Sequence, residues 1–292
     1  MNEDPNRRRV AVVGGGAGGL CAAVAAARAG ARVTIWEKAN RVGKKLLKTG
    51  NGRCNLSNAN VAPDRYNRPE FVAPVLAGTG CGELLAFFAS LGLWTVTDGE
   101  GRVYPLSDTA ASVLDVLRLE CARLGAEERC AGEITELRLR EEGGFVLQTR
   151  EGDREVTDRV IVASGGGTAL LRPLGHPYVP FAPALCPLKT GTDPIRGLTG
   201  LRAKCRAALR RNGETLWRED GEILFRDFGV SGILALDLSR YALPGDELSL
   251  DMLPGTDGEE LASRLEAQRA LCGTDGELFT GIFQIGRASC RE

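Results

Sequence analysis

The sequence has almost no histidine and no closely spaced pair of cysteines. Among its 292 residues there is one histidine, His176, and none of the nine cysteines belongs to a C-x-x-C motif. Zinc sites are built from clustered cysteine and histidine ligands, and Ser-His-Asp and Cys-His catalysis both need a histidine beside the nucleophile. We therefore expect no metal site and neither kind of hydrolytic centre. An odd number of cysteines without a framework pattern is typical of reduced thiols in the cytosol.

A strong charge of one sign is also missing, and so is a long hydrophobic run. The formal net charge is −1, which gives no electrostatic reason to expect a nucleic acid or an acidic membrane as partner. The first ten residues lack the apolar segment that a signal peptide needs. The apolar stretch 20–27 is too short to span a bilayer and is followed by Arg28. The sequence thus predicts a cytoplasmic protein without nucleic-acid or membrane partners.

The most informative stretch runs from Arg9 to Glu37. Val10 to Val13 is a short apolar run, as expected of a parallel strand buried on both faces. It leads into the G-x-G-x-x-G turn of residues 14–19, then an alanine-rich segment over 20–29 that should be helical. Residues 32–36 are typical of a second strand. Strand, glycine turn, helix, strand and terminal acid all fall at the spacing of a dinucleotide-binding βαβ unit.

Each part of that unit has a physical role in holding a dinucleotide. Gly14 permits the tight turn, Gly16 lets the backbone approach a pyrophosphate, and Gly19 lets the helix pack closely on the strand. The N-terminus of the helix offers free N–H groups and a partial positive charge to phosphates. Glu37 can accept hydrogen bonds from ribose hydroxyls. We favour dinucleotide binding over the alternative, a purely structural βαβ turn.

A second loop rich in glycine, asparagine and cations follows at once. Lys44 and Lys45 precede the hexapeptide G-N-G-R-C-N of residues 50–55. Small residues allow the backbone to curl round a ligand, and lysine and arginine supply charge for phosphates. The alternative is an exposed turn with solvated charges.

This loop resembles the signature of the bacterial aminoacetone-oxidase-like flavoproteins, which belong to the FAD/NAD(P)-binding two-dinucleotide-fold class. Their pattern is a glycine turn, a Glu-Lys pair, and then G-[RK]-K-L-L-x-[ST]-G-x-G-R-C-N, which residues 43–55 match. In that family the loop contacts FAD. For Cys54 we favour packing beside the flavin over thiol chemistry. The cofactor contacts predicted for the two loops are Gly14, Gly16, Ala17, Gly18, Gly19, Glu37, Lys38, Lys44, Lys45, Gly50, Gly52, Arg53, Cys54 and Asn55.

The resemblance continues downstream. A G-R-V-Y-P segment at 101–105 precedes a predicted helix over 109–124, and a structural role is favoured for Tyr104 over one near the substrate. Segments 132–139 and 145–149 are predicted to form a β-pair. Segment 158–163 is predicted to be a buried strand that runs into a second glycine turn. In related flavoproteins the strand after the helix meets adenine and the second turn returns to the cofactor, which implies contacts from Ile134, Ala163, Ser164, Gly165 and Gly166.

The fold class predicted from these patterns is α/β. A Rossmann-like FAD-binding domain with a parallel sheet covers 1–186, and an inserted, incomplete β-rich substrate domain with the start of a helical subregion covers 187–285. Strands are expected around 203–209, 215–219 and 247–252, and a helix over 257–271. Family members return to the FAD domain with a late G-L-[YF]-x-x-G-E segment that we do not find, and 286–292 resembles a non-native tail. We therefore expect this chain to bind FAD weakly or not at all.

These features favour a FAD-dependent oxidoreductase that acts on a small organic molecule, either oxidising an amine or ketone or reducing an unsaturated compound. The flavin would carry the hydride or electrons, so we assign no catalytic acid or base. NAD(P)H and oxygen both stay open as the redox partner. The alternatives are a nucleotide-binding or truncated fragment without turnover, and an NAD-linked dehydrogenase.

Overall fold

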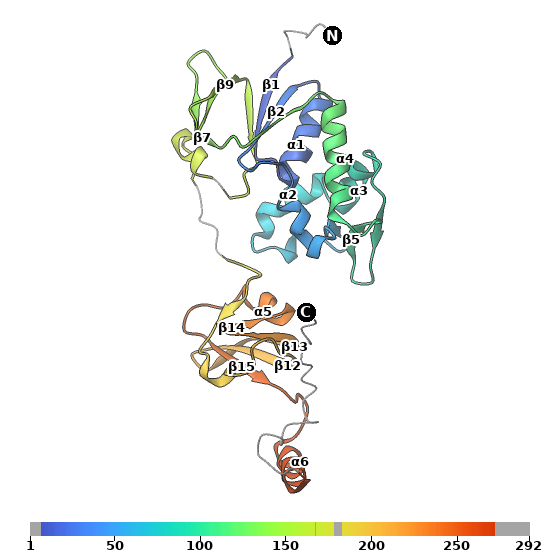
Figure 1. The fold of residues 1–292 in the computed structure, drawn as a ribbon, viewed down its shortest axis with the longest axis vertical. Coiled ribbons are helices and arrows are strands. Elements are labelled where there is room, and N and C mark those ends of the chain that lie inside the picture. Colours follow the sequence, from blue (N-terminus) through green and yellow to red (C-terminus); the bar gives the residue numbers. More distant parts are fainter. Residues whose placement is uncertain (1–6, 167, 178–182, 272–292) are drawn as a thin grey trace. The chain divides into compact units, whose positions relative to one another are not determined.

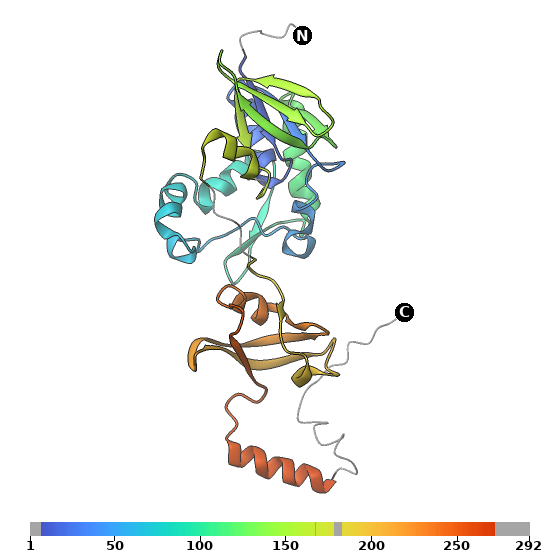
Figure 2. The same cartoon turned by 90° about the vertical axis from the view of Figure 1, so that its left-hand side faces the viewer.

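The computed structural model describes residues 7–166, 168–177 and 183–271, and it divides the chain into two compact units. Unit 1 runs from Met1 to Val179 and unit 2 from Pro180 to Glu292. Figures 1 and 2 show the elements of each unit. The boundary that the sequence indicates, after residue 186, lies a little further along the chain, and the proposed tail 286–292 lies outside the described residues.

Unit 1 is built around a four-stranded parallel sheet. Its strands, in spatial order, are β10 (Arg159–Val162), β1 (Arg9–Val13), β2 (Arg32–Glu37) and β6 (Glu127–Cys130). The helices of unit 1 are α1 (Ala17–Arg28), α2 (Pro69–Gly78), α3 (Cys81–Ala89) and α4 (Ala110–Arg123), with 3-10 turns η1 (Leu46–Gly52), η2 (Pro63–Arg65) and η3 (Thr168–Leu174). Two antiparallel sheets complete it, one of β7 (Ile134–Leu139), β8 (Phe145–Thr149) and β9 (Arg154–Thr157), the other of β3 (Ser57–Asn58), β5 (Arg102–Pro105) and β4 (Thr95–Thr97).

Different layers cover the two faces of the parallel sheet (Figure 1). Val12 of β1 packs in one cluster with Leu20 of α1 and Leu117 of α4, and all three side chains are fully buried. Its neighbour Ala11 packs in a second cluster with Leu147 of β8. Successive strand residues point to opposite faces, so a strand covered on both sides needs the continuous apolar run seen in β1. The Rossmann-like part of the predicted fold is confirmed.

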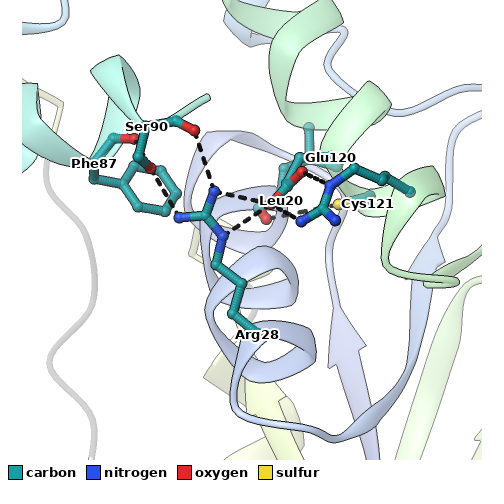
Figure 3. A network of polar contacts seen from close by, with 7 residues as sticks. Leu20, Arg28, Phe87, Ser90, Glu120 and Cys121 are labelled. Carbon is teal, nitrogen blue, oxygen red and sulfur yellow. Dashed lines mark hydrogen bonds and ion pairs between the residues drawn. The ribbon is translucent and has the colours of Figure 1, made fainter. Parts of the chain in front are cut away.

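A charged network joins three helices of unit 1 (Figure 3). Glu120 of α4, whose side chain is 10% exposed, accepts a hydrogen bond from Arg28 of α1 at 2.9 Å and from Arg123 at 2.6 Å. Arg28 also donates to the Ser90 hydroxyl at the end of α3, at 2.8 Å. Hydrogen bonds from Arg123 lower the pKa of Glu120 to about 2, and those from Arg28 add to the effect. The network therefore ties α1, α3 and α4 together through one carboxylate.

We expect Glu120→Gln to reduce the free energy of unfolding at pH 7 by about 1–3 kcal/mol, because two arginines lose their charged partner. The folded pKa lies below the usual value of 4.5. The stabilisation is therefore present above that value and is lost as the pH falls toward about 2. Denaturant unfolding at a series of pH values should show the difference from wild type shrinking over that window. The control Glu142→Gln, at an 80% exposed carboxylate paired with Arg140, should change stability by less than about 0.5 kcal/mol. A pH-independent difference for Glu120→Gln would contradict the prediction.

Unit 2 is an antiparallel sheet with one short helix packed on it. Its strands, in spatial order, are β11 (Leu188–Lys189), β14 (Gly229–Ser231), β13 (Glu214–Arg226), β12 (Arg202–Arg211) and β15 (Glu247–Asp251), with η4 (Asp193–Ile195), α5 (Ile233–Leu238) and α6 (Gly258–Leu271). Its core includes Cys205, Ile223 and Leu234. The β-rich part of the predicted fold class is therefore confirmed.

Strand β13 is longer than the sequence indicates because its charged residues are paired across the sheet. Asp220 bonds to Arg206 at 2.6 Å, and Glu222 bonds to Arg202 at 2.5 Å. Arg206 and Asp220 lie directly opposite each other in the β12–β13 register, whereas Arg202 reaches Glu222 diagonally, because Glu222 lies opposite Lys204. The charged residues of β13 thus form cross-strand pairs with β12.

Among the described residues, no single helix has both the length and the apolar composition needed to cross a membrane. Helices α2 and α3 meet those requirements only when taken together, and the pair is bent by 42° between them.

Candidate functional site

At two positions of the turn after β1, the protein's own packing leaves room only for glycine. Gly14 has φ +109° and its N–H donates to the carbonyl of Trp36 at 2.7 Å. A Cβ on Gly14 would lie 2.5 Å from the carbonyl oxygen of Ala163, and a Cβ on Gly19 would lie 1.8 Å from that of Gly14. Real Cβ atoms are never that close to backbone. These two glycines let β1, α1 and the chain after β10 meet in one place.

Gly16 is different, because the protein leaves space beside it. A Cβ there would meet no atom within 4 Å, and φ is −81°, which any residue adopts. Gly16 is also the N-cap of α1, which has no side-chain cap and no acidic residue in its first turn. The N–H groups of that turn therefore face an open space suited to an anion. A glycine that the fold does not need is consistent with close approach of a ligand.

Glu37 holds the glycine turn in place, a role that the sequence did not indicate. Its Oε2 accepts a hydrogen bond from the N–H of Gly15 at 2.8 Å, and its Oε1 accepts one from Ala39 at 2.8 Å. The carboxylate thus fixes the glycine turn from the end of β2. Each oxygen keeps a further lone pair, so the ribose contact predicted for Glu37 is compatible with both bonds.

A backbone hydrogen bond joins the 43–55 loop to the glycine turn. The N–H of Gly43 donates to the carbonyl of Gly15 at 2.8 Å. The turn at 49–54 then closes through a bond from the N–H of Cys54 to the carbonyl of Thr49 at 3.0 Å. Gly50 and Gly52 have positive φ, as does Cys54, at +62°. The loop is therefore a compact turn held beside the glycine turn.

Lys45 links this loop to the third predicted segment. Its Nζ lies 3.7 Å from where a Cβ on Gly165 would be. Gly165 and Gly166 both have positive φ and follow Ala163, which contacts Gly14. Within the part of the chain that the structure describes, Lys44 and Lys45 form no ion pair, so their charge is available to a ligand. The structure thus brings together the glycine turn, Glu37, the 43–55 loop and the 163–166 turn.

Arg53 is held by the protein rather than left free for phosphate. Its guanidinium lies 4.1 Å from the centre of the Tyr104 ring, and its Nε lies 2.5 Å from Oδ1 of Asp108. Tyr104 is 7% exposed, so it packs beneath Arg53. The sequence did not indicate this pairing because Asp108 lies 55 positions away.

Cys54 is buried, and its environment disfavours the thiolate. Burial raises its pKa, while a hydrogen bond with Thr49 acts in the opposite direction. Burial also raises the pKa of Cys21 and of Cys121 to about 11. These observations agree with the packing role favoured for Cys54, because the thiolate is the reactive form.

We therefore expect Cys54, Cys21 and Cys121 to react slowly with iodoacetamide at pH 7.5. Mass spectrometry of the folded protein should show labelling of each at least about tenfold slower than after denaturation, since burial limits both access and ionisation. Fast labelling of Cys54 alone would instead support thiol chemistry at that position.

The strand placement from which the adenine contact of Ile134 was predicted is wrong. It assumed that the strand after α4 begins near 132, whereas that strand is β6, whose Cys130 pairs with Glu37 in the parallel sheet. Ile134 instead begins β7 and is buried in the core beneath it. The backbone next to Glu37 is that of Ala131 and Gly132, which donate to the carbonyls of Ala39 and Glu37 at 2.8 and 3.1 Å. Strand β6 has the sequence EERC, which lacks the apolar run that would have predicted it.

Comparison with known proteins adds the family. Residues 8–171 match the HI0933-like protein Rossmann domain, and residues 182–272 match the HI0933-like protein barrel and H2TH domain. The chain belongs to the HI0933-like family. This places it among flavin-dependent oxidoreductases and supports that broader class, but not the narrower aminoacetone-oxidase-like label.

Three relatives of the chain carry informative names. It is 37% identical over 298 residues to a 3-dehydro-bile acid delta(4,6)-reductase of Clostridium scindens, covering 94% of this chain and 72% of that protein. It is 27% and 26% identical to ribosomal RNA dihydrouridine synthases of Haemophilus influenzae and Escherichia coli, with 85% of this chain covered in each case. The chain spans 65% and 64% of the length of those two synthases.

Proposed function

We propose that unit 1 binds FAD and that the protein is a FAD-dependent reductase of a small organic molecule in which a carbon–carbon double bond is conjugated to a carbonyl group. The observation that carries the FAD assignment is the convergence of the 14–19 turn, Glu37, the 43–55 loop and the 163–166 turn around an uncapped helix N-terminus. The reductive direction is supported by the relatives, whose names denote reduction of a bile acid and formation of dihydrouridine.

In this proposal each segment holds a different part of FAD. The pyrophosphate lies over Gly16 and the first turn of α1, with Lys45 supplying charge from the neighbouring loop. Glu37 accepts hydrogen bonds from the ribose hydroxyls, and the backbone at Ala131 and Gly132, next to Glu37, borders the adenine. When bound, the flavin supplies the hydride and electron chemistry. The chain's own part is to bind and orient the cofactor.

Reduction needs an electron donor, and we propose a reduced nicotinamide, NADH or NADPH, for this role. The substrate proposed is a free small molecule in preference to RNA, because unit 2 offers no excess of positive charge. Residues 183–271 carry 12 lysines and arginines against 14 aspartates and glutamates. RNA recognition normally needs a basic surface.

The test is to purify the protein, add FAD, remove the free cofactor and record visible flavin absorbance. From the geometry of unit 1 we expect the flavin to be retained, in contrast to the weak binding expected from the sequence. Its absorbance should bleach anaerobically with NADH or NADPH and recover when a conjugated enone is added. Nicotinamide binding without any flavin would favour an NAD-linked dehydrogenase, and no nucleotide binding at all would rule out the FAD site.

A further inference from the structure

Unit 1 contains a cavity of about 510 Å³, open to solvent on one side, outside the candidate cofactor site. It is lined by the loop 59–63, by Ala73, Leu76 and Ala77 of α2, and by the first turn of α3, residues 80–82. Ligand sites in proteins commonly have volumes of about 300–1,000 Å³. The cavity is therefore large enough for a rigid molecule of several fused rings.

The lining offers no charged group to a ligand. None of the side chains that line the cavity is charged, and most are small and aliphatic. An ionised ligand would therefore find no side chain of opposite charge in the lining. Apolar surface, in contrast, is stabilised by roughly 25 cal/mol for each Å² removed from water.

Helix α2 has the properties of an element that such a ligand would complete. It is apolar apart from Glu70, yet none of its residues is buried in the described part of the chain. Phe71 and Val75 are 75% and 57% exposed. Helices in proteins are usually stabilised by packing of an apolar face, and a ligand in the cavity would cover Ala73 and Leu76.

The cavity lies close to the loop proposed to contact the flavin. Ala59 on its rim follows Asn55 by four residues, so their Cα atoms are at most about 14 Å apart. The N–H of Ala59 donates to the carbonyl of Gly101 at 2.7 Å, which fixes this rim to the start of β5. A ligand of several fused rings can therefore extend from the cavity toward that loop.

The first turn of α3 adds hydrogen-bond donors to this apolar lining. The N–H of Gly80 is bonded to Oε2 of Glu83 at 3.0 Å. The N–H groups of Cys81 and Gly82 donate no hydrogen bond to a described residue, as is usual in the first turn of a helix. They are suited to a carbonyl oxygen, a neutral acceptor that needs no counter-charge.

We propose that this cavity binds the fused-ring, carbonyl-bearing part of the substrate. That the ligand is the substrate rests on the proposed function, whereas binding of the ligand depends only on the cavity. The proposed ligand is a neutral polycyclic ketone, because the lining has no charged side chain to pair with a phosphate or a carboxylate.

The experiment measures binding of 4-androstene-3,17-dione, a neutral fused-ring enone, by equilibrium dialysis with the full chain, with and without FAD. The test variant is Ala73→Leu, which adds volume inside the cavity from a helix that buries none of its residues. The matched control is Ala89→Leu, the same change at an exposed position at the other end of α3. Circular dichroism and thermal unfolding show whether each variant folds.

We expect wild type and Ala89→Leu to bind the steroid equally, and Ala73→Leu to bind it at least about tenfold more weakly, with the FAD affinity of all three unchanged. The cavity assignment is overturned if wild type does not bind the steroid or if Ala73→Leu binds it normally. It is also overturned if a uridine-rich RNA oligonucleotide displaces the steroid. If wild type does not bind FAD, that result counts against the proposed function alone, since the dialysis without FAD still tests the cavity.

Discussion

Replacing Gly16 by alanine should leave unit 1 folded and weaken FAD binding about 10- to 100-fold. The protein has room for the new methyl group, because a Cβ on Gly16 meets no atom within 4 Å and φ is already in an ordinary region. A pyrophosphate resting on the first turn of α1 would meet that methyl group. Intruding on a packed contact costs about 1–3 kcal/mol, which corresponds to the stated loss of affinity.

Gly19→Ala separates this ligand effect from a structural one. Its Cβ would lie 1.8 Å from the carbonyl oxygen of Gly14, so the turn or the helix must move. We expect a loss of at least about 3 kcal/mol in the stability of unit 1, together with loss of FAD binding. The matched control is Gly258→Ala, which makes the same change at the start of α6 in unit 2, where a Cβ meets nothing within 4 Å.

Flavin fluorescence titrations and thermal unfolding of the three variants give the comparison. The informative result is that Gly16→Ala and Gly19→Ala both lose FAD while only Gly19→Ala loses stability. If Gly16→Ala bound FAD as tightly as wild type, the glycine turn would be a structural βαβ turn, and the FAD assignment would lose its main support.

The parallel sheet and the glycine turn could be predicted because their signals are local. The apolar run of β1 follows from burial of that strand on both faces. The spacing of the glycines in residues 14–19 follows from the little room between the strand and the next helix. The bounds of α4, Ala110–Arg123, also agree with the predicted 109–124, because its apolar residues at helical spacing pack in the buried cluster that it shares with α1.

Other features depend on partners far away in the sequence and could not be predicted. β6 has only one apolar residue, Cys130, and is a strand because β2 pairs with it. Asp108 neutralises Arg53 across 55 positions, and the cavity beside α2 exists only where three separate segments meet. Such features come from tertiary packing, which local propensity does not report.

The carboxylate of Glu37 shows how a residue predicted for one role also has another, and Glu37→Gln should reveal both. Glu37 accepts backbone hydrogen bonds from Gly15 and Ala39, one on each oxygen. Glutamine has one acceptor oxygen, so one of the two N–H groups would face an NH₂ group. An unsatisfied, partly buried donor costs about 1–3 kcal/mol, and we expect that loss in the free energy of unfolding.

FAD affinity should fall by about 10-fold or more. This is more than disturbance of the glycine turn alone would cause, because the ribose hydroxyls also lose a charged acceptor. The matched control is Glu83→Gln, where Oε2 accepts a single N–H from Gly80. The amide oxygen of glutamine can replace that one acceptor, so the change should cost only a few tenths of a kcal/mol. If Glu37→Gln proved as stable as Glu83→Gln and bound FAD normally, Glu37 would be neither the brace of the turn nor a ribose ligand.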